Sequence, residues 1–211
     1  MLTLALPKGR LLQPVLDLLQ ASGISLAAEA AQNSRRLVFA DHQWRLVLTK
    51  DADVPAYVSQ GVADAGFVGL DHILESGVDL LRVYRLPFGH CSLCLLARAG
   101  VPLPSLAKPF RLATKYPRLG QKLVSQRGLW AEVIPLAGSV ELAATLELAP
   151  FVLDLVETGR TLRENDLVIV ERWLQVAPYF VVNRASWVTR GSEVRTLMHG
   201  LGGGYENRAF V

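Results

Sequence analysis

Short strand-like runs alternate with helix-like segments through most of the chain, and this alternation constrains the fold more than any other feature. The run TLALP at residues 3–7 precedes a helix-period series of apolar residues from Leu11 to Leu19, which Gly23 ends. Strands that alternate with helices typically form a largely parallel sheet covered by those helices. The sequence therefore predicts an α/β fold.

Two interruptions of this rhythm predict two lobes. Two β-rich runs follow each other around Phe88-Gly89, the α/β rhythm restarts at Phe110, and a strand-rich stretch at residues 167–184 leads back to the first lobe. Open α/β sheets bind ligands beyond the carboxyl ends of their strands, so we expect the site in a cleft between the lobes. The expected division, with a double crossover, is 1–88 plus 178–211 for the first lobe and 89–177 for the second.

Composition excludes several classes of protein. Of the 211 residues, 51% are hydrophobic and 19% charged, which is typical of a chain with a sizeable core rather than a disordered one. The net charge is only +3 and no basic block is present, which argues against nucleic-acid binding. The longest uncharged stretch, Leu86 to Ala97, has 12 residues and is too short to span a bilayer. With no secretory layout at the N-terminus, we expect a cytoplasmic location.

The cysteines and histidines do not predict a metal site. Cys91 and Cys94 have C-x-x-C spacing, which suits a redox pair or half a zinc site, but they lie in a strand-like run without a second cluster. We therefore interpret them as buried core residues. The four histidines lack ligand spacing, and no nucleophile elbow is present.

Polar residues suggest where helices begin. Asp53 stands before Val54-Pro55, and Asp71 and Ser139 follow strand-like runs, so each is expected to cap a helix. The last helix is predicted at about Glu193 to Leu201. The Gly-rich segment 200–211 is predicted to be a mobile tail.

The segment FVLDLVETGRTLREN is the strongest candidate for a phosphate site. After a buried-looking strand it offers hydrogen-bond donors and a flexible turn before a helix predicted to begin near Thr161. On spacing alone, an ordinary turn followed by an ordinary helix cap is the favoured explanation of the segment. The candidate residues are Asp154, Glu157, Thr158, Gly159, Arg160 and Thr161.

Several charged residues follow other strand-like runs. In the first lobe a basic turn surrounds Gly9, which suits phosphates but is also typical of a solvated turn. The first-lobe candidates are Lys8, Gly9, Arg10, Lys50, Asp51, Asp53 and Asp71. In the second lobe they are Arg111, Lys115, Tyr116, Ser139 and Glu141, for which solvated charges or helix caps are the simpler interpretation.

Five motifs in a fixed order resemble those of the ATP phosphoribosyltransferase family, whose members catalyse the first step of histidine biosynthesis. They are ALPKGRL, DVPAYVSQGVADAGFVGLDHILE, RLATKYP, GSVEL and DLVETGRTLREN. The resemblance implies a two-lobed fold of the type II periplasmic-binding-protein kind. It also implies a pentosyltransferase that condenses ATP with 5-phosphoribosyl 1-pyrophosphate, with Mg²⁺, to give N1-(5-phosphoribosyl)-ATP and pyrophosphate. The alternative is a two-lobed small-molecule-binding module without catalysis.

The resemblance also implies roles for individual residues. Thr158 to Thr161 would bind the ribose 5-phosphate, and Asp154 or Glu157 would approach the ribose hydroxyls. On the ATP and pyrophosphate side it places Lys8, Gly9, Arg10, Lys50 and Asp71. The catalytic set would be Lys8, Arg10, Glu141 and Asp154, with Mg²⁺ held through substrate phosphates.

The chain ends soon after the helix that contains Met198, which is similar to the short members of the family. Short members depend on a separate regulatory subunit related to histidyl-tRNA synthetase. We therefore expect a hetero-oligomer that histidine inhibits through this partner.

Overall fold

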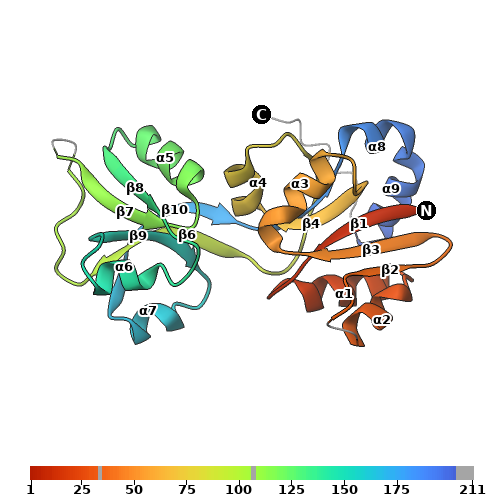
Figure 1. Ribbon diagram of the computed structural model, residues 1–211, viewed down its shortest axis with the longest axis horizontal. Helices are drawn as coiled ribbons and strands as arrows, with labels where there is room; N and C mark the ends of the chain where they lie inside the picture. The colour runs from red at the N-terminus through yellow and green to blue at the C-terminus, as the bar shows by residue number, and fades with distance from the viewer. Residues whose placement is uncertain (33–34, 106–107, 203–211) are drawn as a thin grey trace. The chain divides into compact units, whose positions relative to one another are not determined.

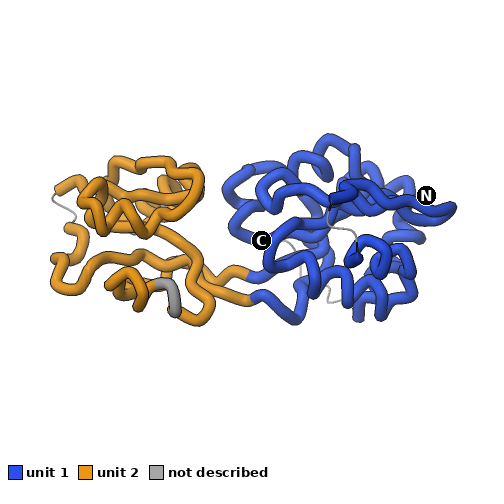
Figure 2. Tube along the Cα trace, turned by 60° about the horizontal axis from the view of Figure 1, so that its bottom comes forward, with its two compact units in different colours: residues 1–89, 177–211 blue, residues 90–176 orange. Residues whose placement is uncertain are grey.

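A computed structural model describes residues 1–32, 35–105 and 108–202 of the protein. The chain divides into two compact units: unit 1 contains Met1–Gly89 and Ala177–Val211, and unit 2 contains His90–Val176 (Figure 2). The chain thus passes between the units twice. From residue 203 onward, the segment predicted to be a mobile tail lies outside the described residues.

Unit 1 contains a six-stranded sheet in the order β2-β3-β1-β4-β11-β5 (Figure 1). Strands β3, β1 and β4 are parallel, whereas β2, β11 and β5 run antiparallel to their neighbours. The strands are β1 (Leu2–Pro7), β2 (Val38–Ala40), β3 (Trp44–Thr49), β4 (Ala65–Gly69), β5 (Leu81–Arg85) and β11 (Pro178–Val182).

Helices cover both faces of this sheet. Alternate residues of β1 point to opposite faces: Leu4 packs with α1, α2 and α9, whereas Ala5 packs with α3 and α4. The helical elements are α1 (Leu12–Ala21), α2 (Leu26–Gln32), the 3-10 helix η1 (Asp51–Asp53), α3 (Val54–Ser59), α4 (Leu70–Ser76), α8 (Arg184–Thr189) and α9 (Gly191–Gly200).

Unit 2 contains a five-stranded sheet in the order β10-β6-β9-β7-β8, in which β9, β7 and β8 are parallel. Helices α6 and α7 pack on one face, and α5 packs on the other through Gly120, which approaches Leu153 and Thr114 (Figure 1). The elements are β6 (Cys91–Arg98), β7 (Phe110–Thr114), α5 (Pro117–Gln126), β8 (Ala131–Pro135), α6 (Glu141–Thr145), β9 (Phe151–Val156), α7 (Arg160–Glu164) and β10 (Leu167–Val176).

The predicted helix caps differ from those observed. Asp53 occupies the N-cap position of α3 but makes no capping hydrogen bond, because the preceding η1 already holds its backbone in a helical conformation. Gly69 is the N-cap of α4, so Asp71 lies inside the first turn and is buried. Val140 is the N-cap of α6, and Ser139 takes a positive φ of 45° before it. The capping roles expected of Asp71 and Ser139 are therefore wrong, whereas Asp53 is the N-cap of α3 by position but without a side-chain hydrogen bond.

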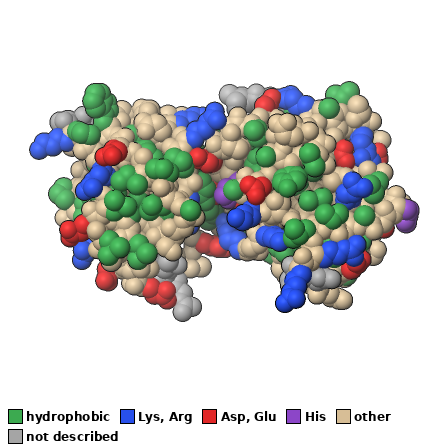
Figure 3. Space-filling model, in the orientation of Figure 1, with side chains coloured by type: hydrophobic (Ala, Val, Ile, Leu, Met, Phe, Trp, Pro, Cys, Tyr) green, Lys and Arg blue, Asp and Glu red, His purple; other side chains and the backbone are tan. Residues whose placement is uncertain are grey.

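On the face seen in Figure 3, Lys and Arg side chains are scattered over both units with Asp and Glu side chains among them. None of the described helices is both long and apolar enough to cross a membrane.

Candidate active site

The parallel strands β7 and β9 of unit 2 bring a carboxylate and a lysine ammonium group together. Thr114 pairs with Leu153 in the register of these strands, so the chain leaves both strands at the same edge of the sheet. Asp154 is the next residue of β9, and Lys115 directly follows β7. The Lys115 Nζ lies 3.4 Å from the Asp154 Oδ2. A solvated charge was the simpler expectation for Lys115, but this lysine forms an ion pair with a candidate catalytic carboxylate.

Asp154 is a buried carboxyl group with 8% exposure. Burial raises its pKa above the ordinary value, and the charge of Glu141 acts in the same direction. Lys115 and the backbone N–H of Leu155 oppose this rise. Glu141 is the first residue of α6 and is half-buried, so the two acids of the predicted catalytic set interact electrostatically.

The predicted phosphate loop follows β9 directly. Glu157 and Thr158 are exposed, and Gly159 has a φ of 72°, a left-handed conformation that favours glycine. Helix α7 begins at Arg160, one residue before the predicted start. The first N–H groups of a helix have no partner within it, so the turn presents backbone donors to the solvent side. The side chains of Arg160 and Thr161 lie outside the described atoms.

In unit 1 the parallel strands β3, β1 and β4 also end at one edge. Pro7 pairs with Thr49, and the N–H of Lys8 donates to the carbonyl of Thr49 at 2.7 Å. The chain then turns at Gly9, whose φ is 98°. A side-chain carbon on Gly9 would lie 3.8 Å from the Asp51 Oδ1, so the turns after β1 and β3 are in close proximity.

The third turn adds Asp71 and His72. Asp71 is 3% exposed, and its Oδ2 lies 3.6 Å from the His72 Nε2. A side-chain carbon on Gly69 would collide with the Asp71 Oδ1, so the carboxylate is folded back over this glycine. Burial raises the pKa of Asp51, whereas the charges of His72 and Arg10 lower it. The three turns therefore form one electrostatically coupled group.

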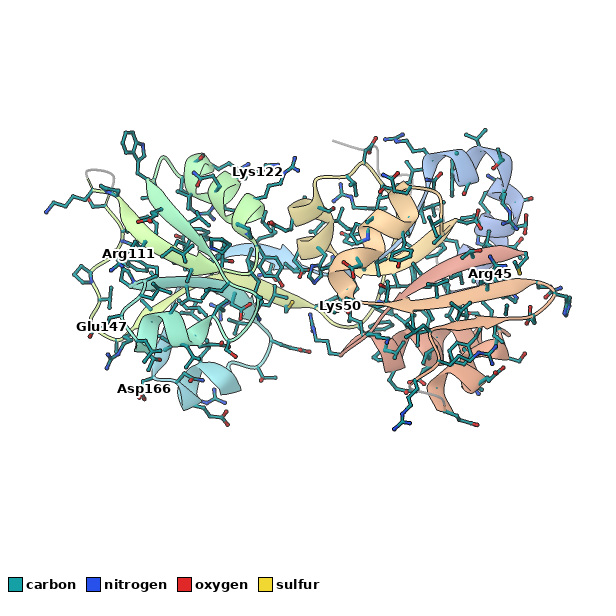
Figure 4. All side chains as sticks on the ribbon, viewed as in Figure 1. Arg45, Lys50, Arg111, Lys122, Glu147 and Asp166 are labelled. Atoms are coloured by element: carbon teal, nitrogen blue, oxygen red, sulfur yellow. The ribbon has the colours of Figure 1, made fainter. Side chains whose placement is uncertain are left out.

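The remaining predicted residues of unit 1 also lie at this edge. Lys8 is half-buried and Arg10 is exposed. Lys50 is exposed and directly follows β3 (Figure 4). Asp51 was a candidate from its place after β3 but had no implied binding role, and His72 was not a candidate. His72 is the chain neighbour of Asp71, and a titratable residue beside a candidate was the signal that could have identified it.

The described part of the chain contains neither a cluster of metal ligands nor a disulfide. No group of three or more His, Cys, Asp or Glu side chains there could hold a metal ion. Cys91 and Cys94 are both free and buried, which confirms their interpretation as core residues.

The fold and the two strand-end sites together define a two-lobed α/β protein of the type II periplasmic-binding-protein class. The chain superposes on the periplasmic aliphatic sulphonate-binding protein SsuA of Escherichia coli with a TM-score of 0.61, covering 95% of this chain and 70% of that one. The SsuA of Xanthomonas axonopodis gives a TM-score of 0.60. Both are only 14% identical to this chain, so they show the fold alone.

Sequence comparison narrows this class to one family. The family model described as ATP phosphoribosyltransferase matches residues 50–203. ATP phosphoribosyltransferase 2 of Geobacter sulfurreducens is 38% identical over 205 residues, which is 95% of this chain and 96% of that protein. The ATP phosphoribosyltransferase of Oceanobacillus iheyensis is 40% identical over 201 residues, or 94% and 96% of the two chains.

A solved structure agrees with these relatives. It is the ATP phosphoribosyl transferase (HisG:HisZ) complex from Thermotoga maritima, with a TM-score of 0.86, 33% identity, and coverage of 96% of this chain and 97% of that one. The chain belongs to the ATP phosphoribosyltransferase family.

Proposed function

We propose that the chain transfers the phosphoribosyl group of 5-phosphoribosyl 1-pyrophosphate to N1 of ATP, which starts histidine biosynthesis. The products are N1-(5-phosphoribosyl)-ATP and pyrophosphate. Beside family membership, one observation carries this proposal: β9 contains the buried carboxylate of Asp154 and is followed by a turn at Gly159 that leads directly into α7. This arrangement offers an anion-binding turn and an acid next to each other, as a sugar phosphate requires.

In unit 2 the turn would bind the 5-phosphate through backbone N–H groups of residues 158–161 and the threonine hydroxyls. Each hydrogen bond to a charged phosphate contributes about 1.5–3 kcal/mol. Asp154 and Glu157 would accept hydrogen bonds from the ribose hydroxyls. Positive charge builds on the ribose ring as pyrophosphate leaves, and Asp154 and Glu141 are the carboxylates that would favour it.

In unit 1 the cationic side chains would neutralise the departing pyrophosphate. Lys8, Arg10 and Lys50 all follow carboxyl ends of strands, and Gly9 lets the backbone turn there. Asp71 would lie on the same side of the site, and Asp51, whose pKa the charge of Arg10 lowers, would help to orient that arginine. The protein then accelerates the reaction mainly by aligning N1 of adenine with the anomeric carbon and by stabilising the leaving oxygens.

We further propose that Mg²⁺ enters with the substrates. Mg²⁺ usually keeps several waters and binds through one or two carboxylates plus substrate phosphates. The described residues contain no cluster of three or more acidic, histidine or cysteine side chains that could hold a metal ion. This fits Mg²⁺ bound through substrate phosphates better than Mg²⁺ coordinated by protein ligands alone. The ion would neutralise pyrophosphate oxygens together with Lys8 and Arg10.

The proposal includes a partner. The similar structure from Thermotoga maritima is a complex of HisG with HisZ, and this chain covers 97% of the matched chain. We expect a hetero-oligomer with a regulatory subunit resembling histidyl-tRNA synthetase, through which histidine inhibits the enzyme. A cytoplasmic location, where both substrates are available, completes the proposal.

A direct assay tests the function. The purified chain, alone and with the regulatory subunit, is mixed with ATP, phosphoribosyl pyrophosphate, Mg²⁺ and pyrophosphatase. We expect near-ultraviolet absorbance to rise as N1-substituted adenine forms, and histidine to suppress the rise only when the partner is present. Omission of phosphoribosyl pyrophosphate is the control. Substrate binding without turnover in the complex would instead favour the small-molecule-binding module.

A further inference from the structure

Lys115 is held in place more firmly than a solvated lysine at a strand end. The preceding residue, Thr114, is fully buried, and its hydroxyl donates to the carbonyl of Leu153 at 2.8 Å. The same hydroxyl accepts from the N–H of Tyr116 at 3.0 Å. The residues on both sides of Lys115 are therefore fixed relative to β9, and the lysine backbone is fixed with them.

The pair that Lys115 forms with Asp154 is asymmetric. The lysine side chain is 38% exposed, whereas the aspartate side chain is 11% exposed. The ammonium group can still reach water, but the carboxylate has lost most of its hydration. An isolated exposed ion pair contributes little, but a buried carboxylate depends on its partner. In this pair the lysine supports the aspartate rather than the reverse.

The other groups around Asp154 do not replace this support. On β6 the residue opposite is Cys94, an uncharged buried thiol, and Arg172 of β10 lies on the far side of that cysteine. From α6 the nearby charge is Glu141, which opposes ionisation of Asp154. From α7, Leu162 belongs to the same apolar cluster as Cys94 and Val152. Among the described side chains, Lys115 is the one cation that acts directly on the carboxylate.

Burial acts against the ionised form of Asp154, and Lys115 acts in its favour. Burial already raises its pKa even with Lys115 present, and removal of the lysine would raise the pKa further. A neutral carboxyl group can accept fewer hydrogen bonds from ribose hydroxyls and cannot stabilise positive charge on the ring. The charge of Asp154 is therefore the quantity on which Lys115 acts.

We propose that Lys115 is a positioning residue for ribosyl transfer, which keeps Asp154 ionised and aimed in one direction while the sugar reacts. This inference rests on the proposed function, because it assigns Lys115 a task only if Asp154 faces the ribose. Lys115 acts through Asp154 and does not itself touch the substrate.

The first experiment compares pH profiles of the complex with the regulatory subunit. The variants are Lys115→Met and Lys115→Arg, with Lys122→Met on the exposed side of α5 as the matched control (Figure 4). In Lys115→Met we expect the acidic limb of kcat/KM for phosphoribosyl pyrophosphate to move upward by about one pH unit. Lys115→Arg restores the wild-type limb, Lys122→Met leaves it unchanged, and KM for ATP stays constant in all three. A uniform loss of activity without a shifted limb would overturn the inference.

The second experiment measures the effect of Lys115 on the titration of Asp154 in the absence of substrate. The carboxyl carbon of Asp154 is followed by ¹³C NMR through a pH titration of the full-length chain, and Asp154→Asn identifies the signal. We expect Asp154 to titrate at higher pH in Lys115→Met than in the wild type, and an unchanged titration would overturn the inference. Should Lys115→Met fail to fold, Lys115→Gln takes its place in both experiments. An enzyme without turnover in any form would refute the proposed function and the role of Lys115, yet the titration would still report whether the pair exists.

Discussion

Arg190 and Asp64 form a part-buried ion pair in unit 1, with 2.9 Å between Nη1 and Oδ2. Asp64 directly precedes β4, and Arg190 joins α8 to α9. The same carboxylate accepts from the N–H of Thr3 at 2.8 Å and from the hydroxyl of Ser186 at 2.9 Å. One acidic side chain therefore ties β1, β4 and the two C-terminal helices together.

Replacement of Asp64 by alanine should lower the stability of the protein strongly. The change removes three hydrogen bonds, two of them from neutral donors, and leaves Arg190 with only Glu193 and a backbone carbonyl as partners. We expect a loss of about 3 kcal/mol in the free energy of unfolding. Urea denaturation measures it. Asp79→Ala removes an exposed pair with Arg184 and should leave the midpoint almost unchanged, so equal effects of the two changes would contradict this account.

Gly159→Val should weaken binding of phosphoribosyl pyrophosphate much more than binding of ATP. A β-branched residue strongly disfavours the φ of 72° found at Gly159, so the turn before α7 must change shape. We expect KM for phosphoribosyl pyrophosphate to rise about tenfold or more, which corresponds to ~1.4 kcal/mol of lost binding. Steady-state kinetics with each substrate varied in turn checks this.

The matched control for Gly159→Val is Gly100→Val. Gly100 also has a positive φ, 84°, and open space around it, but it follows the carboxyl end of the antiparallel strand β6, at the opposite edge of the same sheet. The Gly100→Val change should leave the KM values for phosphoribosyl pyrophosphate and for ATP unchanged. A similar loss for both substrates in Gly159→Val would argue against the phosphate loop, and Thr161→Val provides an independent test of the same loop.

Asp154→Asn should stabilise the substrate-free protein at neutral pH while it removes activity. The pKa of Asp154 is raised in the folded state, so the stability that its neutral form provides is present below the unfolded-state value of 3.8 and is lost as pH rises through the folded-state value. Above that range the wild type has a buried charge that asparagine lacks. Thermal melting should show a gain in Tm for Asp154→Asn at pH ~8, which shrinks toward acidic pH. A variant less stable than wild type at pH ~8 would contradict the sign of the shift.

The two cysteines should be unreactive in the folded protein. Burial raises the pKa of Cys94, so the reactive thiolate is scarce, and Cys91 is 7% exposed. A thiol reagent should label the native chain slowly and should label both cysteines at once in urea. Rapid labelling of the native chain, or a disulfide under mild oxidation, would revive the redox interpretation of the C-x-x-C spacing.

The sequence predicted the order of strands and helices well where each had a strong local pattern. Helices α2 and α8 were missed. The first is built from LAAEAAQ, in which small alanines face the core and give little apolar contrast. The second has Asn183 as its N-cap, whose side chain accepts hydrogen bonds from the N–H groups of Ala185 and Ser186. That capping signal was present in the sequence but lay at the end of a strand-like run.

Side-chain pairs between distant segments could not be predicted in the same way. Lys115 and Asp154 are separated in the chain by α5, β8 and α6, and they meet because β7 pairs with β9 as well as with β8. No local pattern contains that sheet order. The helix cap expected at Ser139 failed for a related reason, since its positive φ depends on how the loop returns from β8 to α6.

The sheet order of unit 1 has a consequence for synthesis on the ribosome. Strand β5 has β11 as its sheet neighbour, and β11 emerges only after all of unit 2 has been translated. Until then β5 has no partner and β4 has an open edge. Unit 2 can therefore complete its sheet first. The sheet of unit 1, although most of its strands are synthesised earlier, is completed last, when β11 inserts between β4 and β5.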